Sequence, residues 1–221
     1  MTLCRSSSYG RRSLLMQWLL GALIIGWSLV ADAESRLASY SGFDRQDLLH
    51  PRWKGRLGIE AGDHEWMSAV IKDMGEDAGQ RFFQDLVRSN GLSVRTGHPL
   101  LTNLTSSGEV PLALTVYQYS VAQAKKKGAP IEWFAIEPAI AIPDGIAVAR
   151  KAPNPNAALL FYDYMLSPEA QRIVARIGYV PTSTRVDSPL KGVKLKLLDA
   201  ATLLDEQERS MARFEEILRS K

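Results

Sequence analysis

Strand-like and helix-like segments alternate along the middle of this chain, and that alternation sets the strongest limit on its fold. The best strand is Val110–Tyr117 (VPLALTVY), which is rich in β-forming residues and apolar on both faces. Extended segments are also predicted at 56–60, 92–95, 131–136 and 140–150, with helices at 63–74, 76–89, 99–106 and 120–127. Such an alternation predicts an α/β sheet with helices on its faces.

The last third of the chain has a helical pattern. Helices are predicted over 156–166, 167–177 and 203–221. The start of the second is well marked, because Ser167 can cap it and Pro168 suits the first helical position. Glu169 adds an acid in the first turn, where the helix dipole favours negative charge.

The N-terminal 33 residues have the order of a secretory signal peptide. Arg5, Arg11 and Arg12 precede an apolar run over 14–30, and the small-residue site Ala31-Asp32-Ala33 follows it. We therefore expect cleavage after Ala33 and a periplasmic location for the rest of the chain. The apolar run is only just long enough to span a bilayer, so a retained membrane anchor is the alternative. The paired arginines leave both the general and the twin-arginine export routes open.

Composition excludes several classes of protein. With 221 residues, 46% of them hydrophobic, the chain is long enough to bury a substantial core. The single cysteine, Cys4, lies in the leader, which excludes a disulfide framework and cysteine-ligated zinc from the remainder. Three arginines and one aspartate also lie there, so the formal net charge of +3 falls to about +1 without the leader. A nucleic-acid binder needs a concentrated basic face, which a nearly neutral chain does not offer.

The sequence lacks the motifs of the common catalytic sites. His64-Glu65 begins like a zinc-binding HExxH motif, but Ser68 occupies the position of the second histidine. A G-x-S-x-G nucleophile elbow, a P-loop and a G-x-G-x-x-G dinucleotide motif are also missing. We therefore expect a binding protein rather than an enzyme, with no resident cofactor.

The strongest candidate for a binding site is the pair Tyr117 and Tyr119, where the best strand ends. In extended backbone, residues two apart point to the same side, and ligands of open α/β sheets collect beyond the carboxyl ends of strands. Two phenols there can coordinate a ferric ion as phenolates, or stack on and hydrogen-bond an organic ligand. The alternative is that one or both tyrosines only cover the strand end with a hydroxyl in water.

Four segments resemble the periplasmic solute-binding proteins of ABC importers, of the type grouped with ferric-ion binders. In the order of that family they are Asp47–Trp66, Gly97–Tyr119, Lys127–Trp133 and Asn154–Pro181. The resemblance implies a type II periplasmic-binding-protein lobe with a mixed sheet flanked by helices. It also implies a monomer that works with an ABC permease of the inner membrane.

The resemblance also implies which residues bind the ligand. In the family a tyrosine pair downstream of a Gly-Glu pair, here Gly108-Glu109, binds iron in the ferric members, and Tyr117 and Tyr119 occupy that place. One residue separates the two tyrosines here, so ferric ion, a small organic anion and a polyamine-like cation all remain open. Thr96-Gly97-His98 resembles the cleft-facing start of a helix, where free backbone N–H groups favour an anion.

Family members carry a first lobe between the signal peptide and the segment that resembles Asp47–Trp66, and most of that lobe is missing here. The expected organisation is a signal peptide 1–33, a tether at the deletion junction 34–50, the second lobe 51–139, a partial first lobe 140–185 and a helical segment 186–221. Without its packing partners, the partial lobe should expose the apolar residues Leu159, Leu160 and Phe161.

These observations lead us to expect an exported substrate-binding component of an ABC transporter. It would bind ferric ion or a small organic solute, with affinity impaired by the loss of the first lobe. The alternative is a binding-incompetent remnant, or a membrane-anchored interaction protein that uses the lobe as a surface. A ligand-induced thermal shift separates the two, because a working site stabilises the native state.

Overall fold

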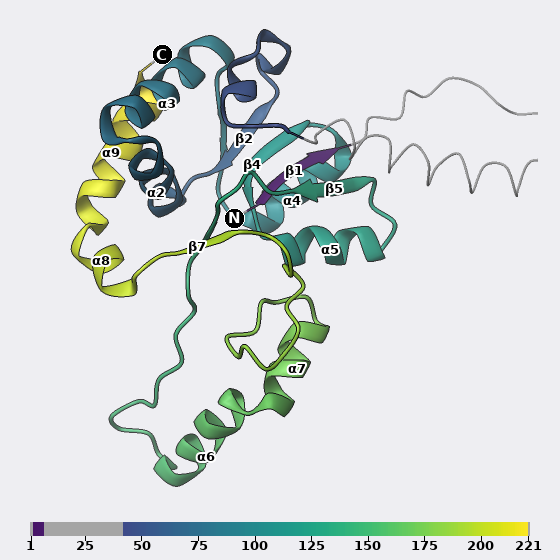
Figure 1. Ribbon diagram of the computed structural model, residues 1–221, viewed down its shortest axis with the longest axis vertical. Coiled ribbons are helices and arrows are strands. Elements are labelled where there is room, and N and C mark those ends of the chain that lie inside the picture. The colour runs from purple at the N-terminus through teal and green to yellow at the C-terminus, as the bar shows by residue number, and fades with distance from the viewer. Residues whose placement is uncertain (1, 7–41, 221) are drawn as a thin grey trace, which may run out of the picture.

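The computed structural model describes residues 2–6 and 42–220, which form a main body and an arm (Figure 1). The main body consists of residues 2–6, 42–136 and 198–220, and the arm of residues 142–193. Two short parallel strands, β6 (Ala139–Ala141) and β7 (Leu195–Leu197), pair where the chain leaves the main body and returns to it.

A five-stranded sheet in the order β3-β2-β4-β1-β5 forms the centre of the main body. Its strands are β1 (Thr2–Ser6), β2 (Leu57–Glu60), β3 (Ser93–Arg95), β4 (Leu112–Val116) and β5 (Ile131–Phe134). β2 pairs in parallel with β3 and β4, whereas β1 runs antiparallel between β4 and β5. The sheet is therefore mixed, as expected, and the carboxyl ends of β2, β3 and β4 lie at one edge.

Helices cover both faces of this sheet (Figure 1). On one face lie α2 (His64–Met74), α3 (Glu76–Asn90) and α9 (Gln207–Arg219), and on the other α4 (His98–Ser107) and α5 (Gln118–Lys126). β4 serves both cores, because Leu112 and Leu114 pack with the first set and Ala113 with the second. Every residue of β4 is buried, which accounts for its almost wholly apolar sequence.

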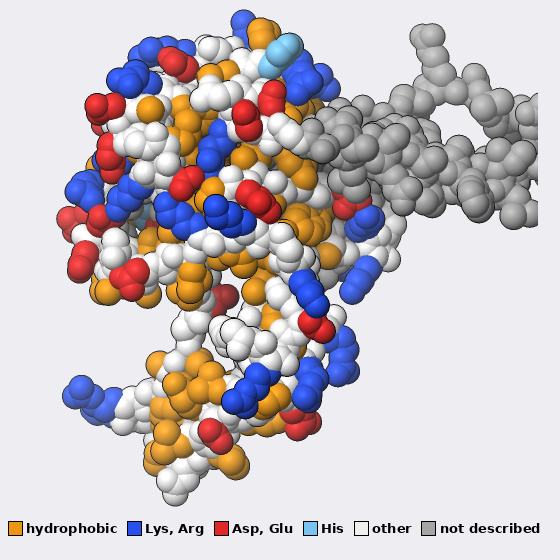
Figure 2. Space-filling model, in the orientation of Figure 1, with side chains coloured by type: hydrophobic (Ala, Val, Ile, Leu, Met, Phe, Trp, Pro, Cys, Tyr) orange, Lys and Arg blue, Asp and Glu red, His pale blue; other side chains and the backbone are white. Residues whose placement is uncertain are grey.

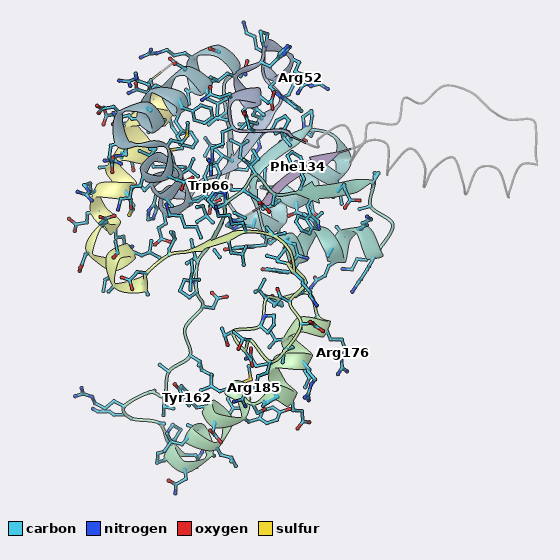
Figure 3. All side chains as sticks on the ribbon, viewed as in Figure 1. Arg52, Trp66, Phe134, Tyr162, Arg176 and Arg185 are labelled. Carbon is cyan, nitrogen blue, oxygen red and sulfur yellow. The ribbon has the colours of Figure 1, made fainter. Side chains whose placement is uncertain are left out.

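The larger core lies under α2 and α3. Figure 3 shows Trp66 inside the main body, where its ring packs edge-on against Phe83 with centroids 5.8 Å apart. Two single-turn helices, η1 (Gln46–Leu49) and η2 (Pro51–Trp53), close this core at the start of the lobe. Asn90 of α3 anchors η1, because its Nδ2 donates a hydrogen bond to the carbonyl of Leu48 at 2.7 Å.

The arm contains α6 (Pro155–Leu166) and α7 (Pro168–Arg176). Ser167 caps α7 as predicted, since its hydroxyl accepts a bond from the Ala170 N–H at 3.3 Å. α6 buries none of its residues, and Leu159, Leu160 and Phe161 are 56%, 72% and 60% exposed. The expected apolar exposure is therefore confirmed, and Figure 2 shows hydrophobic side chains gathered on the arm.

Two expectations about the second half of the chain are wrong. The strand predicted over 140–150 ends at Ala141, because its partner β7 has only three residues and Pro143 cannot donate to a ladder. The helix predicted over 203–221 is two helices, α8 (Ala200–Asp205) and α9, with a break at Glu206. α9 then packs beside α2 and α3, so the end of the chain belongs to the main body.

The first strand falls within the predicted signal peptide. Thr2–Ser6 pairs with β4 on one side and β5 on the other, a role that the sequence did not indicate. The apolar run and the site at Ala33 lie outside the described residues, so cleavage there stays a prediction. In the part of the chain that the structure describes, no helix has the length and apolar character needed to cross a membrane.

Candidate ligand-binding site at the carboxyl edge of the sheet

Four aromatic rings stack in a row at the carboxyl edge of the sheet. The centroid of the His98 ring lies 4.0 Å from that of Tyr117, Tyr117 lies 5.3 Å from Tyr119, and Tyr119 lies 4.1 Å from Tyr179. Adjacent planes differ by 29°, 14° and 22°, so each contact is stacked rather than edge-on. We call this row the tyrosine ladder. Three of its members are the predicted site residues His98, Tyr117 and Tyr119.

The two tyrosines come together by a different route from the one expected. Tyr117 follows β4 with extended backbone (φ −76°, ψ 127°) and is the N-cap residue of α5. Tyr119 already lies in the first turn of that helix, so the pair is not an extended i, i+2 pair. The expectation of two side chains projecting from one strand is therefore wrong, although the two rings do lie side by side.

Tyr179 joins the ladder from the arm. It follows Gly178, whose φ of +99° is a conformation that favours glycine, and a Cβ built there would lie 3.4 Å from the Tyr119 Cβ. A second link is the Gln123 side chain, whose Nε2 donates to the Ile177 carbonyl at 3.4 Å. The ladder therefore crosses from the main body to the arm. The sequence carried no local signal for Tyr179, because this contact is purely tertiary.

Beside the ladder lies a group of metal-ligand side chains, Glu60, Asp63 and His98, which we call the acid–histidine cluster. Glu60 ends β2, Asp63 precedes α2 and His98 opens α4, so each sits where a parallel strand gives way to a helix. One ligand atom of each lies within 4.8 Å of the others. Sequence reasoning missed Glu60 and Asp63 as site residues, although an acid at the end of a predicted strand was a usable signal.

One N–H of the expected anion site at the start of α4 is engaged by a group of the protein itself. The Gly97 N–H donates to Glu60 Oε1 at 2.8 Å, so it is not free for a ligand. Thr96 is exposed beside it. A carboxylate of the protein therefore takes the Gly97 N–H, and a ligand at Thr96, Gly97 and His98 stays a prediction.

The charges around the ladder favour a cation. Burial raises the pKa of the Tyr117 phenol, and the nearby carboxylates of Asp63, Asp144, Glu60 and Glu65 raise it further. Burial and the hydrogen bond to Tyr179 raise the pKa of Tyr119 to about 12. Both phenols are therefore protonated at neutral pH unless a cation displaces the proton, as a metal ion does when it binds such a ligand.

A different hollow lies under β6, lined by apolar side chains that include Trp66, Phe82 and Ile140. The charged residue in its lining is Arg45, which pairs with Asp73 at 3.1 Å. A site for a polar solute needs several convergent polar groups, so this hollow suits packing rather than solute binding.

Comparison with known proteins identifies the family to which this chain belongs. Residues 34–180 match the family of bacterial extracellular solute-binding proteins, and the chain belongs to that family. A curated relative, iron uptake protein A1 of Synechocystis, is 22% identical over 149 residues, which are 61% of this chain and 41% of the relative.

The fold is shared with solved solute-binding proteins. The apo ferric ion-binding protein A of Pasteurella haemolytica superposes with a TM-score of 0.64 at 16% identity, over 79% of this chain and 61% of that one. Iron-bound HitA of Pseudomonas aeruginosa gives a TM-score of 0.55 at 21% identity, over 79% and 60%. The fold is thus that of a type II periplasmic binding protein, and the chain spans less than two thirds of the length of these relatives.

Proposed function

We propose that this chain is the exported solute-binding component of an ABC importer and that it binds a cation, ferric ion in the first place, at the tyrosine ladder. It would deliver the ion to a permease in the inner membrane, without enzymatic activity. The single observation that carries the proposal is the ladder itself, because it sets two stacked phenols at the carboxyl edge of parallel strands.

Electrostatics support a cation over an organic anion. The carboxylates of Glu60, Asp63 and Asp144 act on Tyr117, and each would repel an anion that docks on its phenol. A ferric ion is a hard cation, and phenolate and carboxylate oxygens are the hard ligands that suit such ions. A polyamine-like cation would gain from the same field, and the rings could stack on its charged groups.

The position of Tyr179 supports a role for the arm. Solute-binding proteins of this fold close two bodies around a ligand, and residues that face each other across the gap come from both. Here Tyr119 belongs to the main body and Tyr179 to the arm, with ring centroids 4.1 Å apart. The arm therefore provides part of the second wall, although the chain is shorter than its relatives.

A direct test is titration of the purified chain with ferric citrate. Phenolate coordination should produce a visible charge-transfer absorption band, and that band should disappear in Tyr117→Phe/Tyr119→Phe. The matched control is Tyr164→Phe, because Tyr164 is an exposed phenol on α6. Absence of the band in the parent chain, together with a thermal shift caused by a polyamine, would replace ferric ion with an organic cation at the same site.

The exposed helix α6 supports a second candidate function. Its apolar residues Leu159, Leu160 and Phe161 are all more than half exposed, as in a surface that docks on another protein. In that case the lobe serves as an interaction module and has no working ligand site. No thermal shift with ferric ion, polyamines or organic acids would favour this candidate, since any functional site stabilises the native state by mass action.

A further inference from the structure

The side chains of the acid–histidine cluster are shielded from solvent at the carboxyl edge of the sheet. The side chain of Asp63 is 3% exposed and that of His98 14%, and Glu60 is buried. All three residues come from the main body, and none depends on the arm for its position. Any ligand of this cluster is therefore held by the main body alone.

Two atoms of the cluster lack the hydrogen bonds that burial normally demands. Asp63 Oδ2 and His98 Nε2 lie 3.2 Å apart, yet neither makes a hydrogen bond to the other or to another described group. Asp63 also gives up a local partner, because it occupies the N-cap position of α2 without capping the helix through its side chain. A buried carboxylate left this way is costly, so the pair points to something that both atoms bind.

The 3.2 Å separation fits two ligands of one metal ion. Ligand atoms bonded to the same ion at about 2.0–2.2 Å, with tetrahedral or octahedral angles, lie about 2.8–3.6 Å apart. Each ligand then aims at the ion rather than at the other ligand. That arrangement accounts for a close pair that forms no hydrogen bond.

Hydrogen bonds position the carboxylate of Glu60 to act as a third ligand. Its Oε1 accepts from the Gly97 N–H at 2.8 Å and its Oε2 from the Gly62 N–H at 2.5 Å, while its own N–H donates to Thr115 Oγ1 at 3.0 Å. A carboxylate has about four lone-pair positions, so both oxygens can still bind an ion. Hydrogen bonds from outside the ligand set fix the carboxylate in place, as in established metal sites.

The charge of the cluster also calls for a cation. Among the described residues, no lysine or arginine forms an ion pair with Glu60 or Asp63, and Asp63 is paired only with the His98 imidazole. One imidazole with two carboxylates is a donor set that suits first-row divalent ions such as Zn²⁺, Mn²⁺ and Fe²⁺. Three protein ligands leave at least one position open for water or a solute.

We propose that Glu60, Asp63 and His98 bind a divalent transition-metal ion. This site is separate from the two phenols proposed to take the transported cation, and it lies next to them because the His98 ring stacks on Tyr117. The bound ion joins the end of β2 to the first turns of α2 and α4, and so stiffens the edge on which the tyrosine ladder is built.

The test uses Co²⁺ as a spectroscopic probe on the full purified chain, followed by displacement with Zn²⁺. We expect one Co²⁺ per chain with visible d–d absorption, and at least about a hundredfold weaker binding in Asp63→Asn and in His98→Gln. The matched control is His64→Gln, because His64 adjoins Asp63 but its Nδ1 is engaged with Ser210 Oγ at 2.8 Å. Circular dichroism of every variant confirms that the fold is retained.

The tyrosine variant separates this proposal from the ferric one. Tyr117→Phe/Tyr119→Phe should keep the Co²⁺ spectrum while losing the ferric charge-transfer band. The proposal is overturned if the parent chain binds no divalent ion, or if Asp63→Asn and His98→Gln bind Co²⁺ as tightly as the parent. It is also overturned if Co²⁺ binding is lost with the two phenols and kept without Asp63, because the ion would then lie on the ladder.

Discussion

Replacing Gly79 with alanine should destabilise the main body, although alanine is the better helix former. Gly79 lies in α3 where this helix crosses α2, and a Cβ built on it would lie 2.5 Å from the Cα of Ile71 and 2.7 Å from its carbonyl oxygen. Both contacts are with backbone, so no side-chain rotation can relieve them. The two helices would have to move apart.

The expected magnitude follows from two opposed terms. In an exposed helix, alanine gains about 0.5–1 kcal/mol over glycine. Forcing an extra carbon into a packed interface costs about 1–3 kcal/mol, and contact with rigid backbone places Gly79→Ala at the upper end of that range. The net loss is about 2 kcal/mol, which corresponds to a thermal midpoint lower by about 4–8 °C in a chain of this size.

Equilibrium unfolding in urea measures this change, with the midpoint expected to fall and the slope to stay constant. The control is Gly145→Ala in the arm, where a Cβ would meet nothing within 4 Å. That substitution should shift stability by no more than about 0.5 kcal/mol. An unchanged or raised midpoint for Gly79→Ala would show that α2 and α3 do not cross as closely as described, and the reasoning would be refuted.

Four further predictions follow from the site and the arm. The protein should lose stability between about pH 10 and 12, because the pKa of Tyr119 is raised to about 12 in the folded state and the phenol of the unfolded chain ionises at lower pH. Denaturation midpoints at pH 9 and pH 11 measure this loss, which should be smaller in Tyr119→Phe. Ser167→Ala should cost about 1 kcal/mol in α7, seen as faster amide hydrogen exchange confined to that helix. Leu160→Glu should reduce binding of a hydrophobic dye without lowering the thermal midpoint, since this side chain is 72% exposed. Calorimetry should find weak ligand binding, because most of the first lobe, which forms one wall of the binding cleft, is missing. A loss of about 4 kcal/mol of binding free energy weakens a micromolar site roughly a thousandfold, so a micromolar complex would contradict this prediction.

The sequence predicted the elements whose signals are local. β2, α2, α3 and β4 were found within about two residues, because apolar periodicity and the glycines that end helices mark them. The start of α7 was predicted to the residue from Ser167 and Pro168. Secondary structure that depends on partners elsewhere was not predicted: β1 and β7 are short, and only their neighbours in the sheet make them strands.

For the candidate site too, the sequence predicted the residues with a local signal and missed those that distant contacts bring in. Tyr117 and Tyr119 stand out because they follow the best strand, yet the helix that holds Tyr119 was predicted to begin two residues too late. The hydrogen bond from Gly97 to Glu60 joins residues 37 apart, and the stack of Tyr119 on Tyr179 joins residues 60 apart. Contacts of that range depend on how the elements pack, and a single sequence does not encode that packing in any local pattern.

The strand β1 lies in the segment that the predicted cleavage at Ala33 would remove. Thr2–Ser6 hydrogen-bonds to β4 on one side and to β5 on the other, so the strand fills the interior of the sheet. A cut at Ala33 would release that strand together with the leader, and β4 and β5 would then face each other across an empty row of donors and acceptors. If the predicted cleavage takes place, the five-stranded sheet described here can exist only in the uncut chain. In an uncut chain the same five residues would instead remain as an interior strand that holds β4 and β5 together.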